Sequence, residues 1–262
     1  MLKKISKRIF PVVCVMLISA VFIFVAYTLK DFFDGEQWYI ASSIQRLLFG
    51  IITLIVFVKY FRVEHWKDIF TVKGVKKGLF AGIGLLLYTV YLTVYIAVGA
   101  YSFNGLTLGL ILTQLVCQQI TTGFFEEILY RGLLIGGYFH EEKQNAYKRL
   151  MYAGLSFVIF GLAHIAPNMS FEQGLDRFIT TGIMGFSFAA VYLYSHSLLV
   201  TMFLHAIYDI PSNLLRYVEW TNTPAKLAMD SVYDMIYPCL FIIALVFIIK
   251  SPNRKIKKAP KQ

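Results

Sequence analysis

The sequence predicts an all-α membrane protein, a polytopic transmembrane helical bundle of about eight spans with both termini in the cytoplasm. Of 262 residues, 58% are hydrophobic and 15% are charged, and the mean hydropathy is +0.63. A soluble globular domain has about 45–50% apolar and about 25% charged residues. The apolar residues also form separate runs, and the loops between them alternate in charge. Together these observations predict a chain that crosses a membrane repeatedly.

The apolar runs have the length of membrane-spanning helices. A hydrocarbon core about 30 Å thick needs roughly 20 helical residues, and a helix satisfies its own backbone hydrogen bonds where water is absent. The fourth run is long enough for one span and several further turns. The eight predicted runs are approximately Ile9–Leu29, Tyr39–Val58, Leu79–Ala100, Leu106–Phe139, Leu150–Ala166, Phe178–Tyr194, Leu198–Leu214 and Ser231–Ile249.

Charge in the loops predicts the orientation. Basic residues gather at the N-terminus, in the second loop (including Arg62 and Lys67), in the fourth loop and in the C-terminal tail. The first loop is acidic and the third is uncharged. The positive-inside rule then places both ends in the cytoplasm of a multi-pass cell-membrane protein. The net charge of +10 fits attraction to an anionic lipid leaflet, so we expect the lipid bilayer and no nucleic acid as a partner.

Three groups of ionisable residues lie inside the apolar runs, where a charge costs a few kcal/mol or more and usually marks a function. In the first group, Glu127 and Arg131 are four residues apart on one helical face and can form a salt bridge. Glu126 points about 100° away from Glu127 and is free to face elsewhere. An ordinary ion pair at a helix end is the alternative interpretation of this group.

The other two groups each contain a histidine. Phe160 and His164 share a face, and the small residues Gly161 and Ala163 permit close helix packing. His205 and Asp209 also share a face, so Asp209 could fix the imidazole tautomer, or both could point into a cavity. Each histidine taken alone could be a structural, hydrogen-bonded residue.

Together the groups predict hydrolytic chemistry by one of two routes. Glu126 could act as general base on a water molecule beside His164, while His205 and Asp209 stabilise an oxyanion. Alternatively, Glu126, His164 and His205 form a catalytic zinc ligand set, which leaves one position for water. The residues alone do not choose between the two routes.

The order Glu-Glu-x-x-x-Arg, Phe-x-x-x-His and His-x-x-x-(Asn or Asp) resembles the CPBP family of CAAX-prenyl-protease-like and bacteriocin-processing intramembrane endopeptidases, also called the Abi family. The resemblance implies that Glu126 and His164 activate water and that His205 and Asp209 stabilise the oxyanion. Glu127, Arg131 and Phe160 occupy the supporting positions of the motifs. It also implies a cut near the cytoplasmic face and either a glutamate-type or a metallo-endopeptidase mechanism.

The resemblance divides the chain into N-terminal helices (1–105), a catalytic core (106–214), and a last helix with a basic cytoplasmic tail (215–262). Asp209 stands where the prenyl-protease branch usually has Asn, which favours the bacterial branches over prenylated substrates. The implied substrate is a small peptide or a membrane protein, and the implied roles are peptide maturation or bacteriocin self-immunity.

Two other classes of function fit the composition. A proton-coupled transporter could use Glu126 and the two histidines as a relay, although no symmetry-related halves are evident. A non-catalytic immunity or scaffold protein could keep the same fold.

One expectation conflicts with a shared site. A 20-residue span from Leu106 would place Glu126 near the cytoplasmic end of its helix. His164 would lie about 20 Å from that side if its helix begins at Leu150. The two residues could meet only if the later helix begins earlier or the long helix is steeply tilted.

Overall fold

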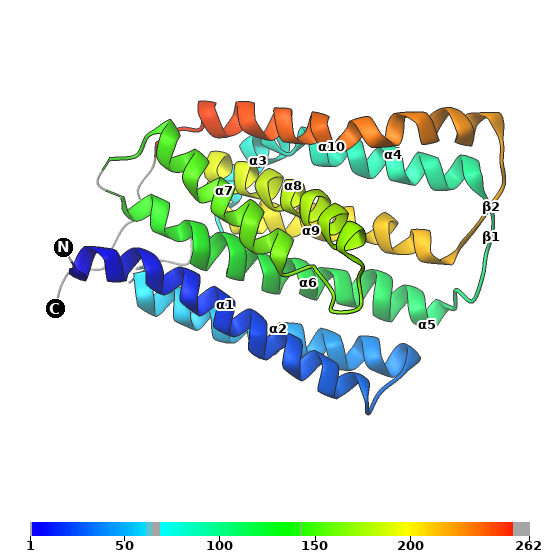
Figure 1. Ribbon diagram of the computed structural model, residues 1–262, viewed down its shortest axis with the longest axis horizontal. Helices are drawn as coiled ribbons and strands as arrows, with labels where there is room; N and C mark the ends of the chain where they lie inside the picture. Colours follow the sequence, from blue (N-terminus) through cyan, green and yellow to red (C-terminus); the bar gives the residue numbers. More distant parts are fainter. Residues whose placement is uncertain (1, 62, 64–68, 142, 254–262) are drawn as a thin grey trace.

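The computed structural model describes residues 2–61, 63, 69–141 and 143–253. Every predicted apolar run is helical over most of its length, and the helices form one elongated bundle (Figure 1). The predicted basic residues Arg62 and Lys67, and the tail beyond Asn253, lie outside the described residues. The principal helices are α1 (Leu2–Lys30), α2 (Gly35–Phe61), α3 (Val75–Ala81), α4 (Ile83–Gly99), α7 (Ala146–Leu162), α8 (Phe171–Ser195), α9 (Leu198–Leu214) and α10 (Pro224–Lys250).

The described helices confirm a polytopic all-α bundle. Five of them are long and apolar enough to cross a membrane, and the bent pairs α3–α4 and the two parts of α10 raise the number to as many as seven. The predicted fifth span is α7, a shorter helix of 17 residues. The first described residues of α1 and the end of α10 lie at the same end of the bundle (Figure 1), the arrangement that an even number of spans produces.

The fourth run forms one continuous helical rod, Leu108–His140. It consists of α5 (Leu108–Leu110), the π-helical η3 (Ile111–Gln118), α6 (Gln119–Glu126), the π-helical η4 (Glu127–Ile135) and the 3₁₀-helical η5 (Gly136–His140). Wide π turns are uncommon and occur often at functional sites. Glu126 and Glu127 lie where α6 passes into η4.

This rod resolves the expected conflict in depth. Glu126 lies 14 residues before His140, roughly 21 Å along an α-helix, and is therefore far from the end of its helix. Helix α7 begins at Ala146, earlier than the predicted Leu150, so His164 lies roughly 27 Å from the start of α7. Glu126 and His164 therefore lie at similar distances from the turn that joins the rod to α7.

Helices α8 and α9 form a tight antiparallel hairpin. His196, the first of the two residues between them, adopts a left-handed conformation with φ of 59° and caps α8. The backbone N–H of Leu198 donates to Ile69 O at 3.0 Å, and the Ser197 hydroxyl donates to Thr71 O at 2.7 Å. These bonds fix the hairpin against the segment before α3. They therefore also fix the position of His205 and Asp209 of α9 along the bundle.

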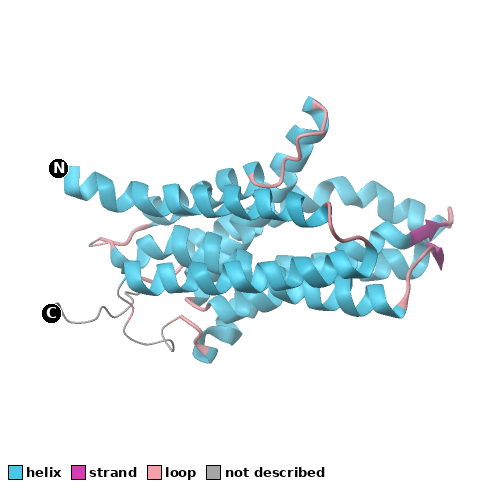
Figure 2. Cartoon of the chain, turned by 90° about the horizontal axis from the view of Figure 1, so that it is seen from below, coloured by secondary structure: helices cyan, strands magenta, loops and turns pink. Residues whose placement is uncertain are grey.

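At the end away from α1 Leu2 and α10 Lys250, two short strands pair. β1 (Ala100–Phe103) and β2 (Val218–Trp220) are antiparallel, with a register shift between Ala100 and Ser102 (Figure 2). The sequence analysis did not predict them. β1 follows α4 and β2 follows α9, so the pair links these two helices beyond their ends.

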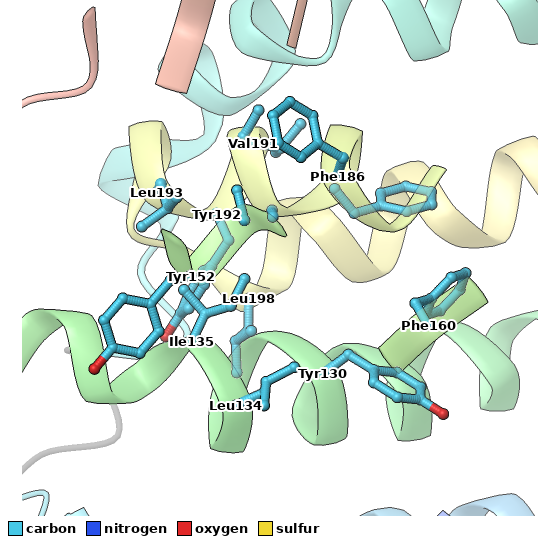
Figure 3. Packing of buried hydrophobic residues seen from close by; sticks show 14 of the residues in the cluster. Tyr130, Leu134, Ile135, Tyr152, Phe160, Phe186, Val191, Tyr192, Leu193 and Leu198 are labelled. Atoms are coloured by element: carbon cyan, nitrogen blue, oxygen red, sulfur yellow. The ribbon is translucent and has the colours of Figure 1, made fainter. Parts of the chain in front are cut away.

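The buried core surrounds the rod. Leu133, Leu134 and Ile135 of η4 are almost inaccessible, as are Leu193 and Leu198 opposite them (Figure 3). Cys14, Cys117 and Cys239 are free cysteines. The rod is thus enclosed along η4, where the polar groups of the first motif lie.

Candidate active site

A buried ion pair forms the base of the site. Arg131 donates from Nη1 to Glu127 Oε1 at 2.8 Å, and both side chains are inaccessible to solvent. The predicted salt bridge is therefore confirmed. Arg131 Nη2 also donates to the carbonyl of Gly185 on α8 at 3.2 Å. The pair joins the rod to α8 and lies deep in the bundle.

Aromatic rings enclose the Arg131 guanidinium. Its Cζ atom lies 4.8 Å from the centre of the Phe160 ring and 5.0 Å from that of Phe188. Tyr130 packs edge-on against Phe160 with ring centres 5.0 Å apart, and Figure 3 shows these two rings side by side. Cation–π contacts of this kind stabilise a desolvated arginine. Phe160, predicted as a supporting residue, thus touches the arginine of the first motif.

His205 lies at the centre of three carboxylates. Its Nδ1 is 2.7 Å from Glu127 Oε1, while its Nε2 is 3.7 Å from Glu126 Oε2 and 3.4 Å from Asp209 Oδ2. An ionised carboxylate only accepts hydrogen bonds, so Nδ1 donates to Glu127 and Nε2 faces the other two acids. The sequence suggested that Asp209 could fix the imidazole tautomer, whereas the Nδ1 bond is made by Glu127.

His164 is oriented by its own helix turn. Its Nδ1 lies 2.7 Å from the carbonyl oxygen of Phe160, and a carbonyl can only accept, so Nδ1 carries the proton. The neutral ring then presents an unprotonated Nε2. The rings of Phe160 and His164 are 4.4 Å apart, which confirms that they share a face. His164 itself lies in the turn just after α7 ends at Leu162.

Glu126 and His164 line the same small cavity, of about 60 Å³. This volume has room for at least one water molecule, which needs about 10–15 Å³ by the same measure. Glu126 Oε2 is buried and has no hydrogen-bond partner among the described residues. The remaining lining residues are Ser19, Phe22, Ile23, Phe125, Tyr130 and Ala163.

Glycines allow the helices to approach closely enough for these contacts. A Cβ atom on Gly123 of α6 would lie 2.8 Å from the Met202 carbonyl oxygen of α9. One on Gly161 of α7 would lie 2.7 Å from the Phe178 carbonyl oxygen of α8, in agreement with the predicted close packing there. Gly123 is one turn before Glu126 and Glu127, so its contact fixes how near these acids come to His205.

The structure therefore brings all the predicted site residues into one region. Glu126 contacts the cavity and His205, His164 closes the cavity from α7, and Asp209 approaches His205 from one turn further along α9. Within the described residues, no three His, Cys, Asp or Glu side chains are arranged to hold one metal ion. The zinc set Glu126, His164 and His205 is not assembled in this arrangement.

Four neighbouring residues were not predicted. Phe188 stacks on the His205 ring with centres 4.6 Å apart, and the Tyr130 hydroxyl lies 3.3 Å from the Ser19 hydroxyl at the cavity wall. Arg46 of α2 lies with its Cζ atom 5.5 Å from the centre of the Phe22 ring, which lines the cavity. Only Arg46 carried a sequence signal, because it is the one charged residue of the apolar run Tyr39–Val58.

Comparison with known families gives one match. Residues 107–211 match the family described as type II CAAX prenyl endopeptidase Rce1-like. This segment is similar to an Rce1-like domain. This confirms the resemblance drawn from the three motifs, since every motif residue lies within the matched segment. Neither the comparison with curated proteins nor that with solved structures gave a match.

The Rce1-like domain and the apolar helices indicate a membrane protein with the general character of an intramembrane CAAX-type endopeptidase. The domain begins one residue before α5 and ends at Pro211, within α9. It therefore includes the whole rod, α7, α8 and most of α9. Helices α1 and α2 lie outside it, although α1 contributes Ser19, Phe22 and Ile23 to the cavity.

Proposed function

We propose that the protein hydrolyses a peptide bond within the membrane, with Glu126 as general base and His164 as its partner in positioning water. The observation that carries the proposal is the shared cavity: both side chains line a space large enough for a water molecule. The buried, unbonded Glu126 Oε2 supplies an acceptor for the proton of that water. The bare Nε2 of neutral His164 can accept a second hydrogen bond from it.

In the proposed reaction, Glu126 takes one proton from water as the water oxygen bonds to the carbonyl carbon of the substrate. The carbonyl π electrons move to oxygen, and the resulting oxyanion needs a donor. His205 Nε2 donates when protonated, while Glu127 holds Nδ1 at 2.7 Å. Collapse of the intermediate breaks the C–N bond, and the proton on Glu126 passes to the leaving amine. Asp209, beside Nε2, stabilises the protonated ring.

We propose a small peptide or a membrane-associated protein as substrate, with a role in peptide maturation or bacteriocin self-immunity. The support is the depth of the site, because Glu126 lies far from both ends of the rod and His164 lines the same cavity among apolar helices. Comparing membrane and secreted peptides of a deletion strain with those of its parent tests this. A peptide that accumulates uncut only in the deletion strain is the expected result, and identical peptide sets would contradict it.

Cleavage of a peptide library by purified protein in detergent tests the reaction. Glu126→Gln and His164→Ala should each lower kcat by about 100-fold or more, because each removes a group acting on water. The exposed Glu172→Gln at the start of α8 is the matched control and should keep wild-type activity. Cleavage that survives both site substitutions would show that these residues do not activate water.

The same assay with a chelator separates the two mechanisms. The glutamate route described above predicts that cleavage persists after chelation. Activity lost on chelation and restored by zinc would instead assign Glu126, His164 and His205 to a metal. Zinc content of the purified protein gives a second measurement that does not depend on turnover.

A further inference from the structure

The cavity beside Glu126 and His164 is too small to admit a peptide. Its volume of about 60 Å³ has room for a few water molecules. Its walls come from three places in the chain: α1, the rod, and the turn that follows α7. A peptide bond can therefore reach Glu126 only when one of these walls moves.

Two of the three walls are tied to each other. Arg131 of the rod donates to the Gly185 carbonyl oxygen of α8 and lies over the ring of Phe160 of α7. The hydroxyl of Ser156 of α7 donates to the same carbonyl oxygen at 3.1 Å. The rod, α7 and α8 thus share one buried contact, and separating the rod from α7 would expose the guanidinium of Arg131.

Helix α1 is the wall that is held least tightly. It lies at the edge of the bundle (Figure 1), and 11% of its most apolar stretch of 18 residues is buried, compared with 39% in the rod and 67% in α8. At the cavity, Ser19 of α1 lies 3.3 Å from the Tyr130 hydroxyl, and Gln45 of α2 donates to the Phe22 carbonyl oxygen at 2.7 Å. Moving α1 therefore breaks few polar contacts.

The ring of Phe22 fills an aromatic pocket next to Glu126. Its centre lies 4.6 Å from that of Phe125 of the rod and 5.4 Å from that of Phe49 of α2. The Cζ atom of Arg46 lies 5.5 Å from the centre of the same ring. Phe22 and Phe125 both line the cavity that contains Glu126. A side chain in this pocket is thus adjacent to the place where water would be activated.

The other walls of the pocket do not depend on α1. A Cβ atom on Gly50 of α2 would lie 3.4 Å from the Cα atom of Phe125, so α2 packs closely against the rod. The Gln118 side chain of the rod donates to the Ser42 hydroxyl of α2 at 3.1 Å. The rings of Phe49 and Phe125 also contact each other, with centres 6.1 Å apart. These walls would stay in place if the ring of Phe22 withdrew.

The chemistry of the pocket favours an aromatic side chain. Aromatic rings prefer tilted and edge-to-face contacts of the kind that Phe22 makes with Phe49 and Phe125. The guanidinium of Arg46 adds a cation–π contact, which an aliphatic side chain could not make. A substrate ring that replaced Phe22 would regain the contacts that the protein loses.

We propose that Phe22 occupies a specificity subsite of the enzyme: a substrate segment entering from the bilayer displaces α1 and places an aromatic side chain in the pocket of Phe49, Phe125 and Arg46. The substrate class is a membrane-embedded peptide with Phe, Tyr or Trp beside the cleaved bond. Cleavage at that bond rests on the proposed function, whereas binding of the aromatic side chain does not depend on turnover.

Substrate preference tests the subsite in the full-length protein in liposomes. Starting from a peptide that the protein cuts, variants are made with Phe or Ala next to the cleaved bond. The Phe peptide should have a kcat/KM at least about tenfold higher, because burial of a ring in an apolar pocket is that favourable. Equal values for the two peptides would overturn the proposal.

Substitutions of Phe22 test the displacement. Phe22→Ala removes the ring that competes with the substrate and should lower KM for the Phe peptide, whereas Phe22→Trp should raise it. The matched control is Phe24→Ala, two residues further along α1, where the side chain is 72% exposed; it should keep the wild-type KM. If Phe22 were only a wall of the binding site, Phe22→Ala would raise KM, and that result would contradict the proposal.

A second variant covers a loss of folding. If thermal unfolding shows that Phe22→Ala is not folded, Phe22→Leu provides the test, since it keeps an apolar side chain at the position and removes only the ring. It should lower KM for the Phe peptide in the same direction. An unchanged or higher KM in Phe22→Leu would contradict the proposal.

Photo-crosslinking separates the subsite from the reaction. The probe is a transmembrane peptide with one benzoylphenylalanine, added to the wild type and to Glu126→Gln. Labelling should map to α2 and the rod around Phe49 and Phe125 in both proteins, and the Phe peptide should suppress it more strongly than the Ala peptide. Labelling spread over the lipid-facing helices, without such competition, would overturn the subsite. If no peptide is cleaved, the proposed function fails while the labelling still decides the subsite.

Discussion

At the scale of single residues, Glu127 is the most constrained acid in the site. Its Oε1 atom accepts from Arg131 at 2.8 Å and is bonded to His205 Nδ1 at 2.7 Å. Glu127 therefore decides which nitrogen of His205 faces Glu126 and Asp209. Removal of its charge would leave the Arg131 guanidinium buried among Phe160 and Phe188 without a counterion.

This arrangement predicts how substitutions in the Glu127–Arg131 pair change the free energy of unfolding. Arg131→Met should lower the free energy of unfolding by about 3–5 kcal/mol, because it leaves the carboxylate of Glu127 buried beside His205 without its arginine. Glu127→Leu/Arg131→Met removes both charges and should be more stable than Arg131→Met alone. Thermal unfolding of the purified proteins in one detergent measures the order. A double variant no more stable than Arg131→Met would contradict this account.

The sequence identified these residues because charge is rare in apolar runs, and the helical spacing of four was enough to predict the Glu127–Arg131 pair. It could not show that Glu127 also binds His205, since that contact joins residues 78 positions apart. Phe188 gave no signal, because a phenylalanine in an apolar helix is ordinary. Arg46 did give one, through the same rule that selected Glu126 and the histidines.

At the scale of helices, the contact between α6 and α9 sets the geometry of the site. Gly123 lies against the α9 backbone at Met202 and Ala206, one turn from Glu126. A methyl group there meets a backbone oxygen at 2.8 Å, and the backbone cannot rotate away as a flexible side chain can. The helices would have to separate, and His205 would move away from Glu126 and Glu127.

Gly123→Ala should therefore lower kcat by about tenfold or more, since small misplacements of catalytic groups have large effects on rate. Gly154→Ala in α7 is the matched control: a Cβ there meets nothing within 4 Å, and alanine favours a helix interior over glycine. Peptide cleavage by the two variants, with thermal unfolding measured in parallel, checks the prediction. Equal activity in both variants would show that the α6–α9 distance is not critical.

Helix positions were largely predictable, because long apolar runs have few alternatives in a membrane. The end of the rod was also predicted, because the run Leu106–Phe139 stops one residue before His140. The depth of Glu126 was not predicted: a 20-residue span from Leu106 would stop near Glu126, whereas the helix continues to His140 and leaves Glu126 far from its end. The paired strands β1 and β2 carry no long alternating pattern and could not be anticipated.

At the scale of the whole molecule, the bundle has two different ends. The first described turns of α1, the end of α10 and the turn between the rod and α7 lie at one end, and the paired strands lie at the other (Figure 1). Lys143, Lys148 and Arg149 belong to the turn between the rod and α7 or to the first residues of α7. Basic residues near helix ends favour the cytoplasm, so the end with the strands is expected to face the opposite side.

This orientation predicts the side of each connection. Single cysteines introduced at Asn104, next to β1, and at Gln144, before α7, should react from opposite sides of the membrane in a background lacking Cys14, Cys117 and Cys239. An impermeant thiol reagent added to intact cells should label Asn104→Cys, whereas Gln144→Cys should require opened membranes. Peptide cleavage by each variant checks that the fold is preserved. Labelling of both cysteines in intact cells, or of Gln144→Cys alone, would contradict a bundle whose chain ends and rod–α7 turn share the cytoplasmic side.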